Sequence, residues 1–336
     1  MKFIFTLAVL LLPAAAQPRV GSVEIYGLRK VPAERIRAAL QVSPGDALPK
    51  SKGAVEERLA ALDGVMAARL EAFCCDKGKP VLYVGIHETG TNPLPVHEWP
   101  DKEAALPPDV MAAYAEFSAA FALAVREDDL TEDLSRGYSL MRHLTCRVIQ
   151  RRFVALAEMH SNAVRNVLAN SNDAGQRAAA AYLLGYLPDR TSALRDLTYA
   201  LEDPDGGVRV NAARALRAFV FFSLQNQDGD LKVDPAVFVP LLGSLELGNR
   251  LEAAKALLLY AEMPSTGGLK LLPPDALAAV LEMARWQYAA HAQPAFLLAG
   301  RLAGWSEDDL LVAWRSGQRA KTLASIERIL THKQTP

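Results

Sequence analysis

The 336-residue sequence has little of several features that would assign it to a particular class of protein. It has no excess of charge of either sign: 37 basic and 38 acidic residues give a formal net charge of -1, so no strong field attracts a polyanion such as nucleic acid. It also lacks the phosphate-loop, nucleophile-elbow and paired-histidine metal motifs. Composition and motifs therefore favour a protein that is not an enzyme and that uses no metal or cofactor.

Long apolar runs are also scarce, and the one that stands out is at the N-terminus. Lys2 precedes the apolar stretch Phe3–Leu12, and the small residues Ala14–Ala16 follow as a processing site. This arrangement is typical of a secretory signal peptide, residues 1–16, and the run is shorter than the roughly 20 residues that span a bilayer. We expect an exported protein, periplasmic or secreted, with no transmembrane segment after cleavage. A bacterial periplasm is the favoured destination.

Cysteine is rare, with three residues in the whole chain, which is too few for a fold built on disulfides. Export places Cys74, Cys75 and Cys146 in a compartment that permits disulfides. Adjacent cysteines do not easily bridge each other, so either Cys74 or Cys75 could pair with Cys146. The sequence leaves open the alternative that all three stay reduced.

Residues 19–88 change periodicity several times within a short distance. Their order of strand, helix, helix, strand, strand predicts a small α+β unit with its helices on one face of a sheet. The expected elements are a strand around Val20–Ile25, helices over Pro32–Leu40 and Gly53–Leu62, and strands over Val65–Phe73 and Val81–His87.

This segment resembles a POTRA domain. The resemblance is carried by an "I.G" motif after the first strand, a "PGD" turn after the first helix, the passage "L..L.GV..A.LE" and a terminal "V.I.E". POTRA domains are protein-interaction modules, often at bacterial envelopes, and many bind a partner by adding its strand to a sheet edge. The resemblance implies the same kind of contact for residues 19–88.

Residues 89–108 are rich in proline and follow neither the helical nor the strand period, which predicts a semi-extended linker. Trp99 within it is expected to pack on one of the neighbouring domains.

The rest of the chain, residues 109–332, is predicted to be helical and contains a repeated sequence motif. Three segments each place an arginine four residues after an acid, followed by an alanine pair. The acid would cap its helix, and the arginine would bind either its own acid or that of the next unit. The members of this ladder are Asp173, Arg177, Asp205, Arg209, Glu246 and Arg250.

The three copies resemble HEAT repeats. That resemblance implies an all-α, armadillo-like solenoid in which the second helices line a concave, protein-binding face. Further helices are expected on both sides of the repeats, over residues 108–125, 131–143, 145–168, 275–290, 292–304, 307–314 and 321–332.

The alignment of the repeats also predicts a basic and aromatic stripe, because positions one after each alanine pair share a face. Such a stripe fits an acidic segment of a protein partner. The alternative, which stays open, is ordinary helix surface with tyrosines packed where repeats meet. The stripe comprises Tyr182, Tyr186, Arg214, Arg217 and Lys255.

These observations predict an exported, non-enzymatic scaffold or adaptor that holds protein partners in the cell envelope and binds no nucleic acid. Two alternatives stay open. One is a HEAT-like enzyme, or a tetrapyrrole-handling protein similar to phycobilin lyases. The other is a structural component of envelope assembly, associated peripherally with an envelope complex.

Overall fold

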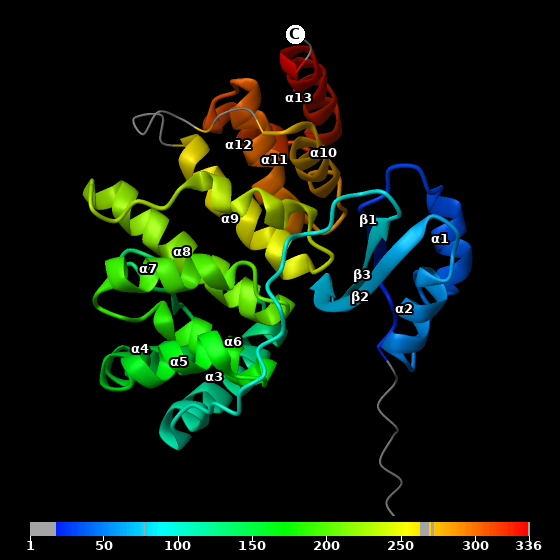
Figure 1. Cartoon of the computed structure of the whole chain (residues 1–336). Coiled ribbons are helices and arrows are strands. Elements are labelled where there is room, and N and C mark those ends of the chain that lie inside the picture. Colours follow the sequence, from blue (N-terminus) through cyan, green and yellow to red (C-terminus); the bar gives the residue numbers. More distant parts are fainter. Residues whose placement is uncertain (1–17, 77, 263–268, 270–271, 335–336) are drawn as a thin grey trace, which may run out of the picture.

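The computed structural model of the chain describes residues 18–76, 78–262, 269 and 272–334, without the side chains of Cys74 and Cys75. It contains a small α+β region followed by a mostly helical region (Figure 1). The predicted signal peptide, residues 1–16, lies outside the described residues.

The N-terminal region has the predicted order of elements and forms a three-stranded sheet. Its central strand, β3, is parallel to β1 and antiparallel to β2, so β1 and β2 are the edge strands. Helices α1 and α2 cover one face of the sheet with aliphatic side chains. The elements are β1 (Ser22–Tyr26), α1 (Ala33–Leu40), α2 (Lys52–Ala60), β2 (Val65–Asp76) and β3 (Lys79–Glu88).

Strand β3 is buried on both faces because helices lie on both sides of the sheet. Leu82 and Val84 belong to the core shared with α1 and α2. Val81 and Tyr83, which point the opposite way along the strand, belong to the core of the helical region. The sheet is therefore the middle layer of three (Figure 1).

The turn from β1 into α1 is closed by Glu88 at the end of β3. Its carboxylate accepts hydrogen bonds from the backbone N–H groups of Arg29, Lys30 and Val31, at 2.7 to 2.9 Å. Burial acts to raise the pKa of Glu88, but these backbone hydrogen bonds outweigh it and the net pKa is lowered. The glutamate of the terminal "V.I.E" motif thus fixes the loop beside the β1 edge.

The linker after β3 runs in an extended form across the helical region towards its first helix (Figure 1). The backbone N–H of His97 donates to the carbonyl of Glu202 at 2.7 Å. The indole N–H of Trp99 donates to the carbonyl of Asn172 at 3.0 Å, and its ring lies over the guanidinium of Arg177. The prediction that Trp99 packs on a neighbouring domain is confirmed.

The helical region is a succession of helices that pack against one another. Helices α4, α6, α8, α9, α11 and α13 follow one another in a row, each in contact with the next, and the remaining helices pack against this row. Its helices are α3 (Pro108–Arg126), α4 (Leu144–Met159), α5 (Ser161–Asn170), α6 (Ala174–Leu184), α7 (Arg190–Ala200), α8 (Gly206–Asn226), η1 (Pro235–Phe238), η2 (Pro240–Gly243), α9 (Leu247–Glu262), α10 (Pro274–Met283), α11 (Ala289–Ala303), α12 (Glu307–Arg315) and α13 (Arg319–Gln334).

One predicted helix, over residues 131–143, is wrong. This segment forms a two-stranded hairpin of β4 (Glu132–Asp133) and β5 (Leu140–Met141). The Asp133 side chain accepts from the backbone N–H of Ser135, and Gly137 has a φ of 74°, so the backbone turns instead of continuing as a helix. The hairpin directs Glu132 inward, where it meets buried arginines.

Candidate functional site

The arginine ladder forms as a chain of contacts between successive units. Arg177, Arg209 and Arg250 each donate to the carbonyl oxygen six residues earlier in the chain. Each also binds a carboxylate of the following unit: Asp203, Glu246 and Glu282 in turn. The predicted capping role holds for Asp173 and Asp205, which accept from the first backbone N–H groups of α6 and α8. The ladder motif includes Asp205 as the acid of the second unit, but the carboxylate that binds Arg177 is that of Asp203, two residues earlier.

The two tyrosines of the predicted stripe lie in the interior. Tyr182 and Tyr186 are buried, and their hydroxyl groups are hydrogen-bonded to each other at 3.2 Å. The Gln150 amide donates to Tyr182, and Tyr186 donates to the carbonyl of Ser139. An exposed binding surface at these positions is therefore wrong, because α4 and the 132–141 hairpin cover the tyrosines, which pack where neighbouring units meet.

The basic members of the stripe form a buried charge cluster with two glutamates. Arg217 binds Glu252 at 2.7 Å and also pairs with Glu132, and Arg214 lies 3.5 Å from Glu132. Lys255 binds Glu252 at 3.0 Å and is the most exposed member. Arg214 and Arg217 are thus already paired within the chain. The hairpin, which the sequence did not predict, supplies the acid that occupies them.

Electrostatics hold this cluster in its ionised form. Burial acts to raise the pKa of Glu132, but the guanidinium groups of Arg214 and Arg217 outweigh it and lower the pKa to about 2. Burial likewise opposes ionisation of Glu252, and Arg217 together with Lys255 holds its pKa below the usual range. The cluster is a structural joint between α8, α9 and the hairpin.

Of the two alternatives that the sequence left open for Cys146, a disulfide and a reduced thiol, the structure has the reduced thiol. Cys146 is a free thiol buried in the first turn of α4, so it bridges neither Cys74 nor Cys75, whose side chains lie outside the described residues. The backbone N–H of Cys146 donates to the ring of His143, which caps the helix. Among the described residues, no group of three histidine, cysteine or acidic side chains could hold a metal ion.

The second face of the sheet docks on the helical region through aromatic side chains. The Tyr26 hydroxyl donates to the carbonyl of Leu245 at 2.6 Å, and Tyr83 is hydrogen-bonded to Nδ1 of His291 at 2.7 Å. The ring of Trp286 contacts both tyrosine rings. Burial lowers the pKa of His291 to about 3, so its imidazole is neutral in this contact.

Three carboxylates join the two regions through backbone N–H groups. Glu24 of β1 accepts from Gln287 at 2.7 Å, and Glu71 of β2 accepts from Leu247 at 2.6 Å. Glu282 of α10 accepts from Gly27 at 3.0 Å in the opposite direction. Burial raises the pKa of all three carboxyl groups. These bonds fix the sheet against the start of α9, against α10 and against the turn before α11.

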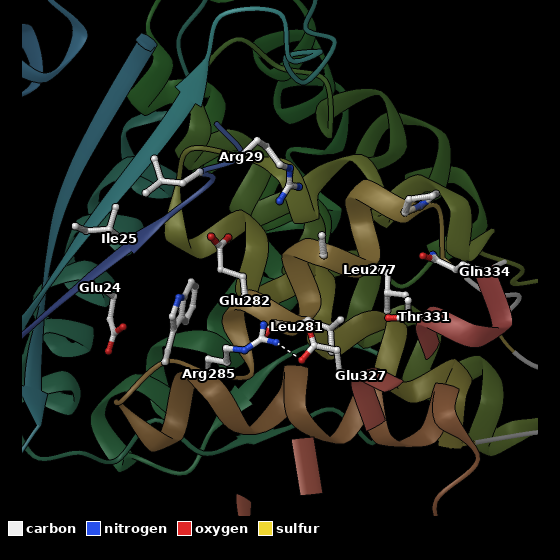
Figure 2. A pocket seen from close by; sticks show the side chains of 14 residues that line it. Glu24, Ile25, Arg29, Leu277, Leu281, Glu282, Arg285, Glu327, Thr331 and Gln334 are labelled. Atoms are coloured by element: carbon white, nitrogen blue, oxygen red, sulfur yellow. Dashed lines mark hydrogen bonds and ion pairs between the residues drawn. The ribbon is translucent and has the colours of Figure 1, made fainter. Parts of the chain in front are cut away.

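A cleft of about 560 Å³ remains beside this joint, between β1, α10 and α13. Figure 2 shows Glu24, Ile25 and Arg29 on the sheet side, with side chains of α10 and α13 opposite them. Arg285 and Glu327 form an ion pair across the helical wall. The helical wall of the cleft comprises Leu277, Leu281, Glu282, Arg285, Glu327, Thr331 and Gln334.

Two features suit this cleft to an extended polypeptide. One wall is the edge strand β1, whose neighbour in the sheet is β3 on one side only. The indole N–H of Trp286, which also lines the cleft, is buried and has no hydrogen-bond partner among the described residues. The backbone of an extended segment carries N–H and C=O groups that can pair with the free edge of β1, and a C=O that can accept from the indole N–H of Trp286.

Sequence reasoning identified the strand but not the cleft, because the opposite wall comes from α10 and α13, some 250 to 310 residues later in the chain. The available signal was the group Trp286, Tyr288 and His291 around the start of α11. Trp286 and His291 are the partners of the tyrosines of β1 and β3. No known family model matches the chain, and no curated protein matches it. Function is therefore inferred from the cleft and its surroundings.

Proposed function

We propose that this protein is a non-enzymatic protein-binding scaffold of the cell envelope, which holds an extended segment of a partner in the cleft beside β1. The N-terminal region is interpreted as POTRA-like and the helical region as a HEAT-like solenoid. The observation that carries the proposal is the edge strand β1 facing the cleft wall of α10 and α13.

Strand addition explains the chemistry of both walls. A partner strand next to β1 would pair with the backbone groups on the free edge of the sheet. The buried indole N–H of Trp286 would gain a carbonyl acceptor from the same strand. Aliphatic side chains of the partner would contact Ile25 and Leu277, while Arg285 and Glu327 offer both charges at the rim.

The first test uses peptides selected from a random library against the purified protein. We expect Ala278→Trp, which fills the cleft with an indole ring, to weaken binding of a selected peptide by at least about tenfold. Ala38→Trp is the matched control, because Ala38 is exposed on α1, on the other side of the sheet. Equal loss in both variants would show that the effect is not specific to the cleft.

The second arm tests the backbone contact itself. Methylation of alternate peptide nitrogens removes donors from one edge of the bound strand, so one of the two methylated peptides should lose binding and the other should keep it. Amide hydrogen exchange should slow in β1 and stay unchanged in β2. Selected peptides that tolerate both methylation patterns would contradict strand addition.

A further inference from the structure

Glu24, on the sheet side of the cleft beside β1, carries a charge that the chain leaves without a cationic partner (Figure 2). It is only 8% exposed, and one carboxylate oxygen accepts the hydrogen bond from the backbone N–H of Gln287. Within the described residues, Glu24 forms no other hydrogen bond and no ion pair within 4.0 Å. Its second oxygen is therefore an unused acceptor, and a buried charge without a partner is costly.

The other charged side chains that line the cleft already have partners of opposite charge. The pairs are Arg29 with Asp275, Arg285 with Glu327 and Glu282 with Arg250. Opposite charges at these positions offset each other. The charge of the cleft wall that lacks an ion-pair partner among the described residues is thus the carboxylate of Glu24.

Arg319 acts on Glu24 only from beyond contact distance. Its guanidinium is occupied by the backbone carbonyls of Arg285 and Trp286, to which it donates. Burial raises the pKa of Glu24, and the hydrogen bond from Gln287 and the charge of Arg319 offset only part of that effect. The carboxylate therefore still lacks a cation that touches it.

The position of Glu24 on β1 determines which residue of an added strand would meet it. Side chains alternate between the two faces of a strand, and Glu24 points to the same face as Tyr26, towards the helical region. The flanking Val23 and Ile25 point to the other face and pack on the core of α1 and α2. A residue directly opposite Glu24 on a neighbouring strand would point to the same face, with the two Cβ atoms about 4.5 to 5.5 Å apart.

We propose that the cleft selects a partner segment that carries a basic residue, lysine or arginine, opposite Glu24; this inference rests on the function proposed above. The cation would supply the ion pair that Glu24 lacks, and opposite charges directly across two strands stabilise their pairing. Trp286 lines the same cleft and precedes the residue that binds Glu24, so its indole offers an apolar surface to the stem of the basic side chain.

The same arrangement disfavours partners that lack a base at this position. An added strand would remove the remaining water from Glu24. A neutral residue opposite it would leave the charge buried and unpaired, and an acidic residue would add repulsion. Selectivity therefore arises from the penalty on wrong partners as well as from the ion pair.

The test uses peptides selected from a random library whose binding Ala278→Trp weakens, so that they occupy the cleft. We expect lysine or arginine at one fixed position of these peptides. Replacement of that residue by norleucine, which keeps an aliphatic stem without the charge, should weaken binding by at least about tenfold.

Glu24→Gln is the complementary change, because it removes the charge and keeps an acceptor for the backbone N–H of Gln287. It should weaken binding of the basic peptide by the same factor and leave binding of the norleucine peptide unchanged. The matched control is Glu34→Gln on α1, on the other side of the sheet, since the side chain of Glu34 is 83% exposed. This control should alter binding of neither peptide.

The melting temperature of the free protein separates recognition from a structural role. Because the charge of Glu24 is desolvated without a cation, Glu24→Gln should melt at the same temperature as wild type or higher, although it binds the basic peptide less well. A variant that melts at a lower temperature and loses both peptides equally would contradict the proposal, since Glu24 would then only hold the fold.

Failure of this inference can be distinguished from failure of the proposed function. Peptides that bind in the cleft without a preferred base, or that bind Glu24→Gln as tightly as wild type, overturn the basic selectivity and leave the scaffold proposal intact. Absence of any peptide binding, or equal binding by Ala278→Trp and Ala38→Trp, overturns both.

Discussion

Five charged side chains meet in the interior where the 132–141 hairpin touches α8 and α9. Except for Lys255, which is partly exposed, these charges have lost most of their hydration and depend on their partners for stabilisation. Glu132 is the link, because it faces both Arg214 and Arg217 and comes from a separate segment of chain. Glu132, which lies outside the repeated sequence motif, is therefore the residue on which the stability of this joint depends most.

Glu132→Gln should lower the free energy of unfolding by about 3 kcal/mol, because it keeps the shape but leaves two buried guanidinium groups with less countercharge. Denaturant unfolding at neutral pH measures the loss. Glu158→Gln on the exposed face of α4 is the control and should change stability by less than about 0.5 kcal/mol. A loss no larger than that of the control would show that the pairing adds little.

His291 gives the joint between the two regions a defined pH dependence. Its pKa is about 3 in the folded protein and 6.5 for an unperturbed imidazole. Between these values the unfolded chain binds a proton that the folded chain does not, so this residue makes the free energy of unfolding fall as the pH drops from 6.5 towards 3. The slope is at most about 1.4 kcal/mol per pH unit.

The measurement is the difference in unfolding free energy between wild type and His291→Gln at several pH values. A difference is needed because burial raises the pKa of Glu24, Glu71 and Glu282, and those groups give the opposite dependence: their burial penalty grows as the pH rises through and above 4.5. The advantage of wild type should shrink as the pH falls. His332→Gln, on exposed α13, tests whether loss of any imidazole gives the same change.

At the scale of elements, the position of β3 depends on a glycine. A Cβ at Gly85 would lie 2.6 Å from the carbonyl oxygen of Leu245 and 2.8 Å from the ring of Tyr26. The backbone of β3 thus approaches the helical region more closely than a side chain would allow. Docking of the whole sheet depends on that approach.

Gly85→Val should therefore destabilise the protein by about 1 to 3 kcal/mol through overpacking. It should also speed proteolysis of the linker, which begins directly after β3. Gly53→Ala is the matched control, because Gly53 lies in α2 with open space around its Cβ position and should become slightly more stable. Thermal unfolding and limited digestion report both effects, and an unchanged Gly85→Val would mean that the sheet shifts freely.

The elements themselves could be predicted from the sequence wherever one periodic pattern dominated. The order of the N-terminal strands and helices, the caps at Asp173 and Asp205, and the ladder arginines are all local or repeated signals. The 132–141 hairpin was missed because its buried Glu132 is stabilised by arginines about 80 residues away. The stripe was wrongly predicted to be exposed for the same reason. The sequences of α6 and α8 contain no local signal that α4 and the hairpin cover these side chains.

At the scale of the whole molecule, the chain returns on itself. The sheet region comes first in the sequence but docks on α9 to α11, while the linker runs back along the helical region to α3 (Figure 1). The cleft beside β1 therefore exists only when both ends of the chain are in place. Its two walls are built from residues 24–29 and residues 274–334.

That arrangement sets an order of events during synthesis. Tyr26 and Tyr83 emerge early, yet their partners Leu245 and His291 follow some 200 residues later. Until then, an aromatic sheet face stays uncovered on a chain that cannot complete its fold, and contacts this distant in sequence form slowly. At roughly 5 to 20 residues per second the interval is tens of seconds, during which this aromatic face is exposed to non-specific association with other chains.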